Sequence, residues 1–429
     1  MKKIFTLFLP LLALQSMAQT KIEAHKPAPT KKDQTVDTYF GQKVADPYRW
    51  LEDDNSKETA DWVSMQNKMT ENYLSQIQFR PKVNKELTQM WNYTKYSSPF
   101  KEGRYIFFYK NDGLQNQAVL YMQRGLDALP EVFIDPNKLN AEGTSSLGTV
   151  SVSKSQKYAA YAVSKAGSDW QDIMLMEVDS KKLLTDKIEY SKFSGIAWNG
   201  DEGFYYSGYD KPIEKNKFSA KTEFQKIFYH TIGTSQAKDK LIYEDKEHPL
   251  RYKSAALTED NLWLMLSISE GTDGSELQFW NLKDPSQKDF KVLMPGFKTN
   301  QEFIDNVDGM FMIYTNYNAP NYQVALVDPS NPNPNSWKII IPEGKEKLES
   351  VSRVGDKIFC NYLNNACSRV DVFNLFGTYE STVQLPGLGT VSGFGGSKKD
   401  DLAFYTFTSF NTAPTIYMYD VNYGTSRDF

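Results

Sequence analysis

The sequence contains few of the residues that build disulfide frameworks and metal centres: its 429 residues include only two cysteines and three histidines. Cys360 and Cys367 are too few for a disulfide scaffold. His25, His230 and His248 are far apart in the sequence and no cysteine cluster accompanies them, so we predict no zinc site and no bound cofactor. We expect each of these imidazoles to be either solvated or packed in the interior.

The sequence also lacks Gly-x-Ser-x-Gly, the pattern of a serine nucleophile on a strand-to-helix turn. The nearest strings, GTSSLG and GFGGSKKD, have a different spacing and fall in expected turns. Carboxylates are numerous, but they recur at expected hairpin turns, where aspartate favours the local backbone. These turn carboxylates are Asp201, Glu202, Asp260, Asp308, Asp400 and Asp401. A calcium ion in such a turn is the alternative to a structural role, and no catalytic set is recognisable.

No charge of one sign dominates, because the sequence has 49 basic and 53 acidic residues and a net charge of -4. No basic stripe with interleaved aromatic residues is present, so nucleic-acid binding is not expected. With 40% hydrophobic residues, the chain has enough apolar material for one large core or two smaller ones.

Long hydrophobic runs are absent except near the start of the chain. Residues 4–14 are apolar, follow two lysines and precede Ser16-x-Ala18, a pattern typical of a signal peptide. The run is too short to span a bilayer. We therefore predict a signal peptide at residues 1–18, cleaved near Ala18, and a monomeric periplasmic or secreted protein with no membrane partner. Export would allow a disulfide between Cys360 and Cys367, although two unbonded residues on a strand pair is the favoured alternative.

Residues 19–32 are rich in lysine and proline and lack periodicity, which predicts a flexible lead. Residues 33–93 then contain a helical pattern. Trp62, Met65, Met69 and Tyr73 recur at steps of three and four residues, and a second pattern of this kind follows Pro81. The sequence therefore predicts two helices with a broad apolar face before residue 94.

From residue 94 to 429 short aromatic and aliphatic runs alternate with turn residues, which predicts many strands. A turn followed by an aromatic-led strand recurs seven times, and most repeats continue with further strands in the same order. The leading aromatic residues are Tyr105, Tyr158, Phe204, Trp263, Phe311, Phe359 and Phe404. A four-stranded sheet repeated in this way is typical of a propeller blade. We predict a mainly-β fold, a β-propeller of seven four-stranded blades.

Several strings in the same order resemble the prolyl oligopeptidase family of serine peptidases. They are TYFGQKVADPYRWLEDD at residues 38–54, NDGLQNQAVLY at 111–121, DPNKL at 135–139, KFSGIAWNGDEGFYYSGYDKP at 192–212 and FTSFNTAPTIY at 407–417. The resemblance implies a seven-bladed propeller that restricts access of oligopeptides to an α/β-hydrolase domain carrying Ser, Asp and His. No residue of this chain matches that catalytic set, so we expect the hydrolase domain to be absent here, or on a separate chain, and residues 1–429 to be inactive alone.

The resemblance also implies roles for individual residues. Phe193 matches a position near the distal part of a bound peptide, although packing between blades is an equally strong alternative. Ser269 falls where the family carries a cation, so anchoring of a substrate carboxylate is in doubt. In the family the N-terminal segment packs on the hydrolase domain. The residues expected to dock there are Trp50, Trp62, Met65 and Met69.

Two other interpretations remain open. The chain could be a stand-alone propeller that binds peptides or proteins without catalysis, or a lectin-like or scaffold propeller. A propeller that functions alone would be expected to lose the apolar face of the first helix, and the sequence keeps it.

Overall fold

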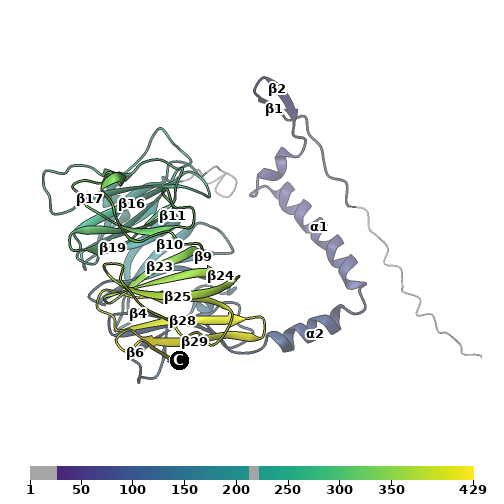
Figure 1. Ribbon diagram of the computed structural model, residues 1–429. Helices are drawn as coiled ribbons and strands as arrows, with labels where there is room; N and C mark the ends of the chain where they lie inside the picture. Colours follow the sequence, from purple (N-terminus) through teal and green to yellow (C-terminus); the bar gives the residue numbers. More distant parts are fainter. Residues whose placement is uncertain (1–26, 212–221) are drawn as a thin grey trace, which may run out of the picture. The chain divides into compact units, whose positions relative to one another are not determined.

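The computed structural model describes residues 27–211 and 222–429 (Figure 1). The predicted signal peptide, His25 and most of the predicted lead lie outside these residues. The described chain forms two compact units, one ending at Met90 and one running from Trp91 to Phe429. In the part of the chain that is described, no helix is long and apolar enough to cross a bilayer.

The first unit consists of a hairpin and helices. Strands β1 (Val36–Tyr39) and β2 (Gln42–Ala45) pair antiparallel, and the short helix η1 (Arg49–Glu52) precedes α1 (Lys57–Ser75) and α2 (Arg80–Trp91). The Ser56 side chain accepts a hydrogen bond from the backbone N–H of Thr59 and so caps the start of α1. The residues whose spacing predicts a helix, from Trp62 to Tyr73, all lie on α1.

The second unit is built of antiparallel strands, and its described residues include three short 3₁₀ helices between them. The first sheet contains β3 (Lys95–Tyr96), β4 (Phe100–Glu102), β5 (Tyr105–Asn111), β6 (Val119–Arg124) and β7 (Glu131–Ile134). The second contains β8 (Ser145–Val152), β9 (Tyr158–Lys165), β10 (Gln171–Glu177), β11 (Leu183–Asn199), β12 (Gly203–Gly208), β13 (Lys226–Thr231) and β14 (Lys240–Tyr243). The 3₁₀ helices are η2 (Pro136–Lys138), η4 (Gln236–Lys238) and η5 (Pro334–Ser336).

Four further sheets have four strands each. They are β15 (Tyr252–Leu257), β16 (Trp263–Ser269), β17 (Ser275–Asn281) and β18 (Lys291–Met294); β19 (Gln301–Val307), β20 (Met310–Thr315), β21 (Gln323–Val327) and β22 (Lys338–Ile341); β23 (Lys347–Val354), β24 (Lys357–Asn364), β25 (Cys367–Asn374) and β26 (Tyr379–Thr382); and β27 (Thr390–Gly395), β28 (Leu402–Ser409), β29 (Thr412–Asp420) and β30 (Thr425–Asp428).

The prediction of seven separate four-stranded blades is therefore wrong. The described strands after Met90 form five separate blade-sized sheets, one of them with five strands, and one continuous seven-stranded sheet. The reason is β11, which is 17 residues long. Its first part pairs with β10 and its last part with β12, so strands that the repeat pattern assigns to two blades share one hydrogen-bonded sheet. Counting aromatic-led strands does not reveal such a shared strand.

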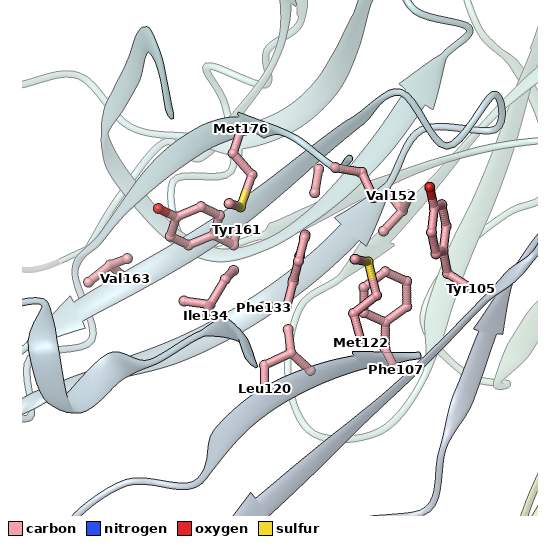
Figure 2. Packing of buried hydrophobic residues seen from close by; sticks show 12 residues of the cluster. Tyr105, Phe107, Leu120, Met122, Phe133, Ile134, Val152, Tyr161, Val163 and Met176 are labelled. Atoms are coloured by element: carbon pink, nitrogen blue, oxygen red, sulfur yellow. The ribbon is translucent and has the colours of Figure 1, made fainter. Parts of the chain in front are cut away.

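Apolar clusters between neighbouring sheets close the propeller into a ring. Figure 2 shows the cluster between the first and second sheets, where Phe107 and Met122 face Val152 and Tyr161. Similar clusters lie between the following pairs of sheets. A small cluster of Ile106 with Phe404 and Met418 joins the first sheet to the last. Because alternate side chains of each strand point to opposite faces, both faces of these sheets carry core residues.

The two cysteines are not bonded to each other. Cys360 on β24 lies opposite Asp371, and Cys367 at the start of β25 lies opposite Asn364. The two cysteines therefore lie on paired strands of one hairpin but are not opposite each other. This agrees with the predicted alternative of two unbonded residues on a strand pair. Burial and the nearby Asp371 raise the pKa of the Cys360 thiol, which keeps it protonated and unreactive.

Candidate functional site

Phe193 lies at an interruption in β11. Between Ser191 and Ile196 the pairing with β12 shifts register, and both Tyr190 and Phe193 adopt left-handed backbone conformations, with φ of 59° and 53°. Such a conformation is costly for a bulky residue and is retained where the surrounding structure enforces it. Its consequence here is that the Phe193 ring leaves the core and is 55% exposed.

The Phe193 ring borders a polar cavity of about 670 Å³ in the seven-stranded sheet. Strand β8 supplies Ser146, Gly148 and Thr149 to its wall, and the turn between β9 and β10 supplies Ser168 and Asp169. Gly148 allows the Gln171 side chain to approach the backbone closely, because an added Cβ would lie 2.6 Å from Gln171 Nε2. The cavity thus combines one exposed aromatic face with hydroxyl and backbone groups.

Lys192 organises the aromatic residues around this cavity. Its ammonium group lies 5.2 Å from the Phe193 ring centre and 5.5 Å from the Trp170 ring centre, and 3.5 Å from the Asp169 carboxylate. Cation–π contacts at these distances are favourable and restrict the rings. On its other side Phe193 makes an edge-to-face contact with Tyr252, at 5.6 Å between ring centres.

Ser269 is close to this group through strand pairing, because it lies opposite Tyr252 in the β15–β16 ladder. Ser269 carries no charge, but Arg251 precedes Tyr252 and brings a guanidinium group to the same edge. Arg251 pairs with Glu270 at 3.0 Å and lies 4.6 Å above the Phe297 ring. Sequence reasoning named Phe193 and Ser269 and missed Lys192, Trp170, Tyr252 and Arg251. Of these four residues, only Lys192 is adjacent in the sequence to a residue already named, Phe193.

The histidines lie elsewhere. His230 is completely buried, with Nδ1 2.7 Å from Asp239 Oδ1 and Nε2 3.1 Å from Asp186 Oδ1. Burial alone would lower the pKa of His230, but the hydrogen bonds and charges of Asp239 and Asp186 outweigh it and raise that pKa. His230 is thus packed in the interior, which is one of the two predicted alternatives. Within residues 27–211 and 222–429, no group of three His, Cys, Asp or Glu side chains is arranged to hold a metal ion.

Comparison with known proteins identifies the fold family. Residues 27–428 match the family described as the N-terminal β-propeller domain of prolyl oligopeptidase. The chain belongs to the prolyl oligopeptidase family. Its relatives include the prolyl endopeptidases of Elizabethkingia miricola, 41% identical, and Elizabethkingia meningoseptica, 42% identical, each over 93% of this chain.

Solved structures of prolyl oligopeptidase relatives superpose on the same residues. A structure from a study of two prolyl endopeptidases and their inter-domain dynamics has a TM-score of 0.84 at 33% identity over 94% of this chain. Prolyl oligopeptidase B of Galerina marginata, bound to a 35mer hydrolysis and macrocyclization substrate, has a TM-score of 0.80 at 28% identity. The chain spans 56% of the Elizabethkingia proteins and 59% of these two structures, so it corresponds to their propeller part.

The predicted docking residues of this prolyl oligopeptidase propeller chain differ in exposure. Trp50 and Trp62 are half-buried within the first unit, where their indole N–H groups donate to the Lys31 carbonyl and the Thr30 hydroxyl. Met69 is also half-buried, whereas Met65 is 40% exposed. Other apolar side chains, which the sequence analysis does not assign to docking, are more exposed. They are Phe79 (66%), Leu87 (58%), Met90 (72%) and Trp91 (64%).

Proposed function

We propose that this chain is the gating propeller of a serine-type endopeptidase that cleaves short peptides after proline. The observation that carries the proposal is the match of residues 27–428 to the propeller domain of relatives that are named prolyl endopeptidases. The catalytic serine, aspartate and histidine would come from an α/β-hydrolase domain outside these residues. The role of the propeller is then to select and position the peptide.

The Phe193 cavity supports this role. A peptide lying across the exposed Phe193 and Tyr252 rings would bury apolar surface, while the serine hydroxyls of the cavity would satisfy its backbone groups. The cavity volume of about 670 Å³ suits a few residues of a peptide. The Arg251 guanidinium is held by Glu270, so we do not assign it to a substrate carboxylate.

The exposed apolar residues of α1 and α2 support a second part of the proposal, the docking of these helices on the hydrolase domain. Met65, Leu87, Met90 and Trp91 are each at least 40% exposed. Covering a large apolar side chain contributes roughly 1.5 to 3 kcal/mol, so these four residues together would stabilise a domain interface. The half-buried Trp62 would lie at the edge of such an interface.

A chimera tests the proposal. Residues 1–429 would be joined to the hydrolase domain of the Elizabethkingia miricola prolyl endopeptidase, and cleavage of a Gly-Pro chromogenic substrate would be measured. We expect the chimera to cleave it and residues 1–429 alone to release no product. Cleavage by residues 1–429 alone, blocked by a serine-directed inhibitor, would contradict the proposal. An inactive but folded chimera that binds proline-containing peptides would favour the stand-alone binding protein instead.

In the active chimera, Phe193→Ala is expected to raise KM for a proline-containing octapeptide by roughly fivefold to tenfold, with kcat nearly unchanged. The reason is that an aromatic contact distant from the scissile bond contributes equally to substrate and transition state. Phe376→Ala is the matched control, because Phe376 has the same 55% exposure but lies in the turn after β25, away from the cavity. Equal KM values for Phe193→Ala and Phe376→Ala would exclude Phe193 from the peptide site.

We also propose that the protein is exported, cleaved near Ala18 and monomeric in the periplasm or the medium. The lysines, apolar run and Ser16-x-Ala18 pattern at the start of the sequence support this. Expression of the full chain followed by cell fractionation should recover a species whose N-terminal sequence begins near Gln19. Recovery of the uncleaved chain from the cytoplasm would contradict the proposal.

A further inference from the structure

One end of the channel enclosed by the propeller is crossed by bonds between sheets that are not neighbours. The inner strands β15, β19, β23 and β27 line a cavity of about 320 Å³ near the carboxyl ends of these strands. Three turns meet there: residues 153–157 after β8, residues 258–262 after β15 and residues 396–401 after β27. We call them the mouth turns.

The mouth turns are joined by direct polar contacts. Lys154 Nζ donates to the Thr258 carbonyl at 2.6 Å and to Asn261 Oδ1 at 2.8 Å, although the last part of β11 lies between β8 and β15. The backbone N–H of Lys398 donates to Glu259 Oε1 at 3.0 Å. This second contact joins the turn after β27 to the turn after β15. The sheets that begin with β19 and β23 lie between these two along the ring, so the contact crosses the channel.

Further contacts tie the mouth turns to the inner strands. Lys398 Nζ pairs with Asp305 at 3.0 Å and donates to Asn306, and the Asn306 amide donates to Asp260 at 2.7 Å. Arg353 holds the other oxygen of Asp305. On the first sheet, Lys101 pairs with the buried Asp400 at 2.5 Å, and Asp400 also accepts the backbone N–H of Ser397. Each of these carboxylates therefore has a cation or an N–H donor.

Glu302 on β19 lines the cavity, has no such partner among the described residues, and has a pKa raised by burial. Glu102 is a second carboxylate of this kind at this end of the channel. It is half-buried at the end of β4, and within residues 27–211 and 222–429 its carboxyl group has neither a hydrogen-bond nor an ion-pair partner. Burial together with the charges of Asp400 and Glu259 raises its pKa to about 7. The charges that act on it are those of Asp400, from the turn after β27, and Glu259, from the turn after β15. The other charged groups of the mouth are Lys101 on its own strand, Asp401 and Lys398 from the turn after β27, Asp260 from the turn after β15, and Lys154 from the turn after β8.

We propose that the mouth of the channel is a pH-sensitive latch in which ionisation of Glu102 loosens the contacts that join the mouth turns. The cations at the mouth already have partners, since Lys101 holds Asp400, Lys398 holds Asp305 and Lys154 binds the turn after β15. A negative charge on Glu102 therefore repels Glu259 and Asp400 without compensation. Because Glu259 accepts the cross-channel bond from Lys398, its displacement opens this end of the channel. The latch requires no peptide cleavage and stands whether or not the proposed function does.

The direction of the pH effect follows from the raised pKa. Opening of the mouth returns Glu102 to water, where its pKa is near 4.5, so ionisation favours the open state. A return from about 7 to 4.5 predicts that the equilibrium for opening increases about tenfold between pH 6 and pH 8.5. Below pH 6 the mouth is closed, and alkaline pH loosens it.

Amide hydrogen exchange of the complete chain tests the latch. Exchange of residues 396–401 would be followed by mass spectrometry at pH 6 and pH 8.5 and divided by the intrinsic rate at each pH. In the wild-type protein we expect protection to fall about tenfold between the two pH values. Glu102→Gln keeps the size of the side chain and cannot ionise, so its protection should not change with pH.

Two controls make the result specific. Asp401→Asn removes an exposed carboxylate that lies 4.0 Å from Lys101, and this variant should retain the wild-type fall. Residues 357–364 on β24 report global opening and should keep their protection in all three proteins. An equal fall in wild type and Glu102→Gln would overturn the proposal, as would constant protection in the wild-type protein.

Discussion

Replacement of His230 by leucine is expected to lower the free energy of unfolding by about 3 to 5 kcal/mol at pH 6, because breaking a buried ion pair leaves uncompensated charges. Asp186 and Asp239, the two carboxylates that face the imidazole, would lose their partner. Both carboxylates are nearly inaccessible to water, with side-chain exposures of 3% and 2%. Asp239 would keep the Tyr206 hydroxyl at 2.8 Å, and Asp186 the Gly233 N–H. These neutral donors cannot replace a cation.

The His230 effect should depend on pH. Folding raises the pKa of His230 above its unfolded value, so the stabilisation is fully present below about pH 6.5 and is lost as pH rises through the folded pKa. The difference between wild type and His230→Leu, measured by urea denaturation, should therefore shrink at alkaline pH. His248→Leu is the control, because the His248 side chain is 43% exposed, and little change is expected. Equal losses in the two variants would show that the buried charge cluster is not responsible.

Gly274→Ala is expected to destabilise the propeller by about 2 to 5 kcal/mol. Gly274 lies between β16 and β17 with φ of 80°, a left-handed conformation that costs an alanine roughly 1 to 2 kcal/mol. In addition, the new Cβ would overlap the carbonyl oxygen of Phe297, which must move, and overpacking of this kind costs typically 1 to 3 kcal/mol. The Arg251 guanidinium lies over the Phe297 ring, so displacement of Phe297 should also disturb the edge of the Phe193 site.

Gly296→Ala separates the two contributions to the Gly274 effect. Gly296 has φ of 83° but no neighbouring atom within 4 Å of an added Cβ, so only the backbone strain remains. Urea denaturation of both variants should show a loss of about 1 to 2 kcal/mol for Gly296→Ala and a larger loss for Gly274→Ala. If the two losses were the same, the collision with Phe297 would have no measurable cost.

Local features of this fold could be predicted from the sequence because they depend on neighbours along the chain. Trp62, Met65 and Met69 recur with the helical period and lie on α1, and the aromatic-led segments at Tyr105 and Phe359 begin the strands β5 and β24, or lie within them. The number of sheets depends on which strands share hydrogen bonds, and the sequence of β11 contains no signal that its first part pairs with β10 and its last part with β12. The break at Phe193 is similarly invisible, since neither Tyr190 nor Phe193 is a residue that favours a left-handed conformation.

The candidate site was predictable only in part for the same reason. Phe193 and Ser269 were named because their surrounding strings resemble a family, yet Tyr252, which joins them, comes from pairing between β15 and β16. The partners of His230 lie 44 residues before it and 9 residues after it, in segments that read as ordinary strand and turn. Nothing in the sequence around Glu102 indicates a raised pKa. The charges that raise it belong to Glu259 and Asp400, which follow Glu102 by more than 150 residues.

The seventeen-residue strand β11 has a consequence for how the propeller comes apart. Sheets held to their neighbours by side-chain packing alone can open one at a time, whereas strands joined by a common backbone ladder cannot separate without breaking β11 itself. Strands β8 to β14 should therefore behave as one cooperative foldon of seven strands, wider than the sheets of four or five strands in the rest of the ring. Partial unfolding would begin among the smaller sheets, leaving the part of the molecule that holds Phe193 intact to the last.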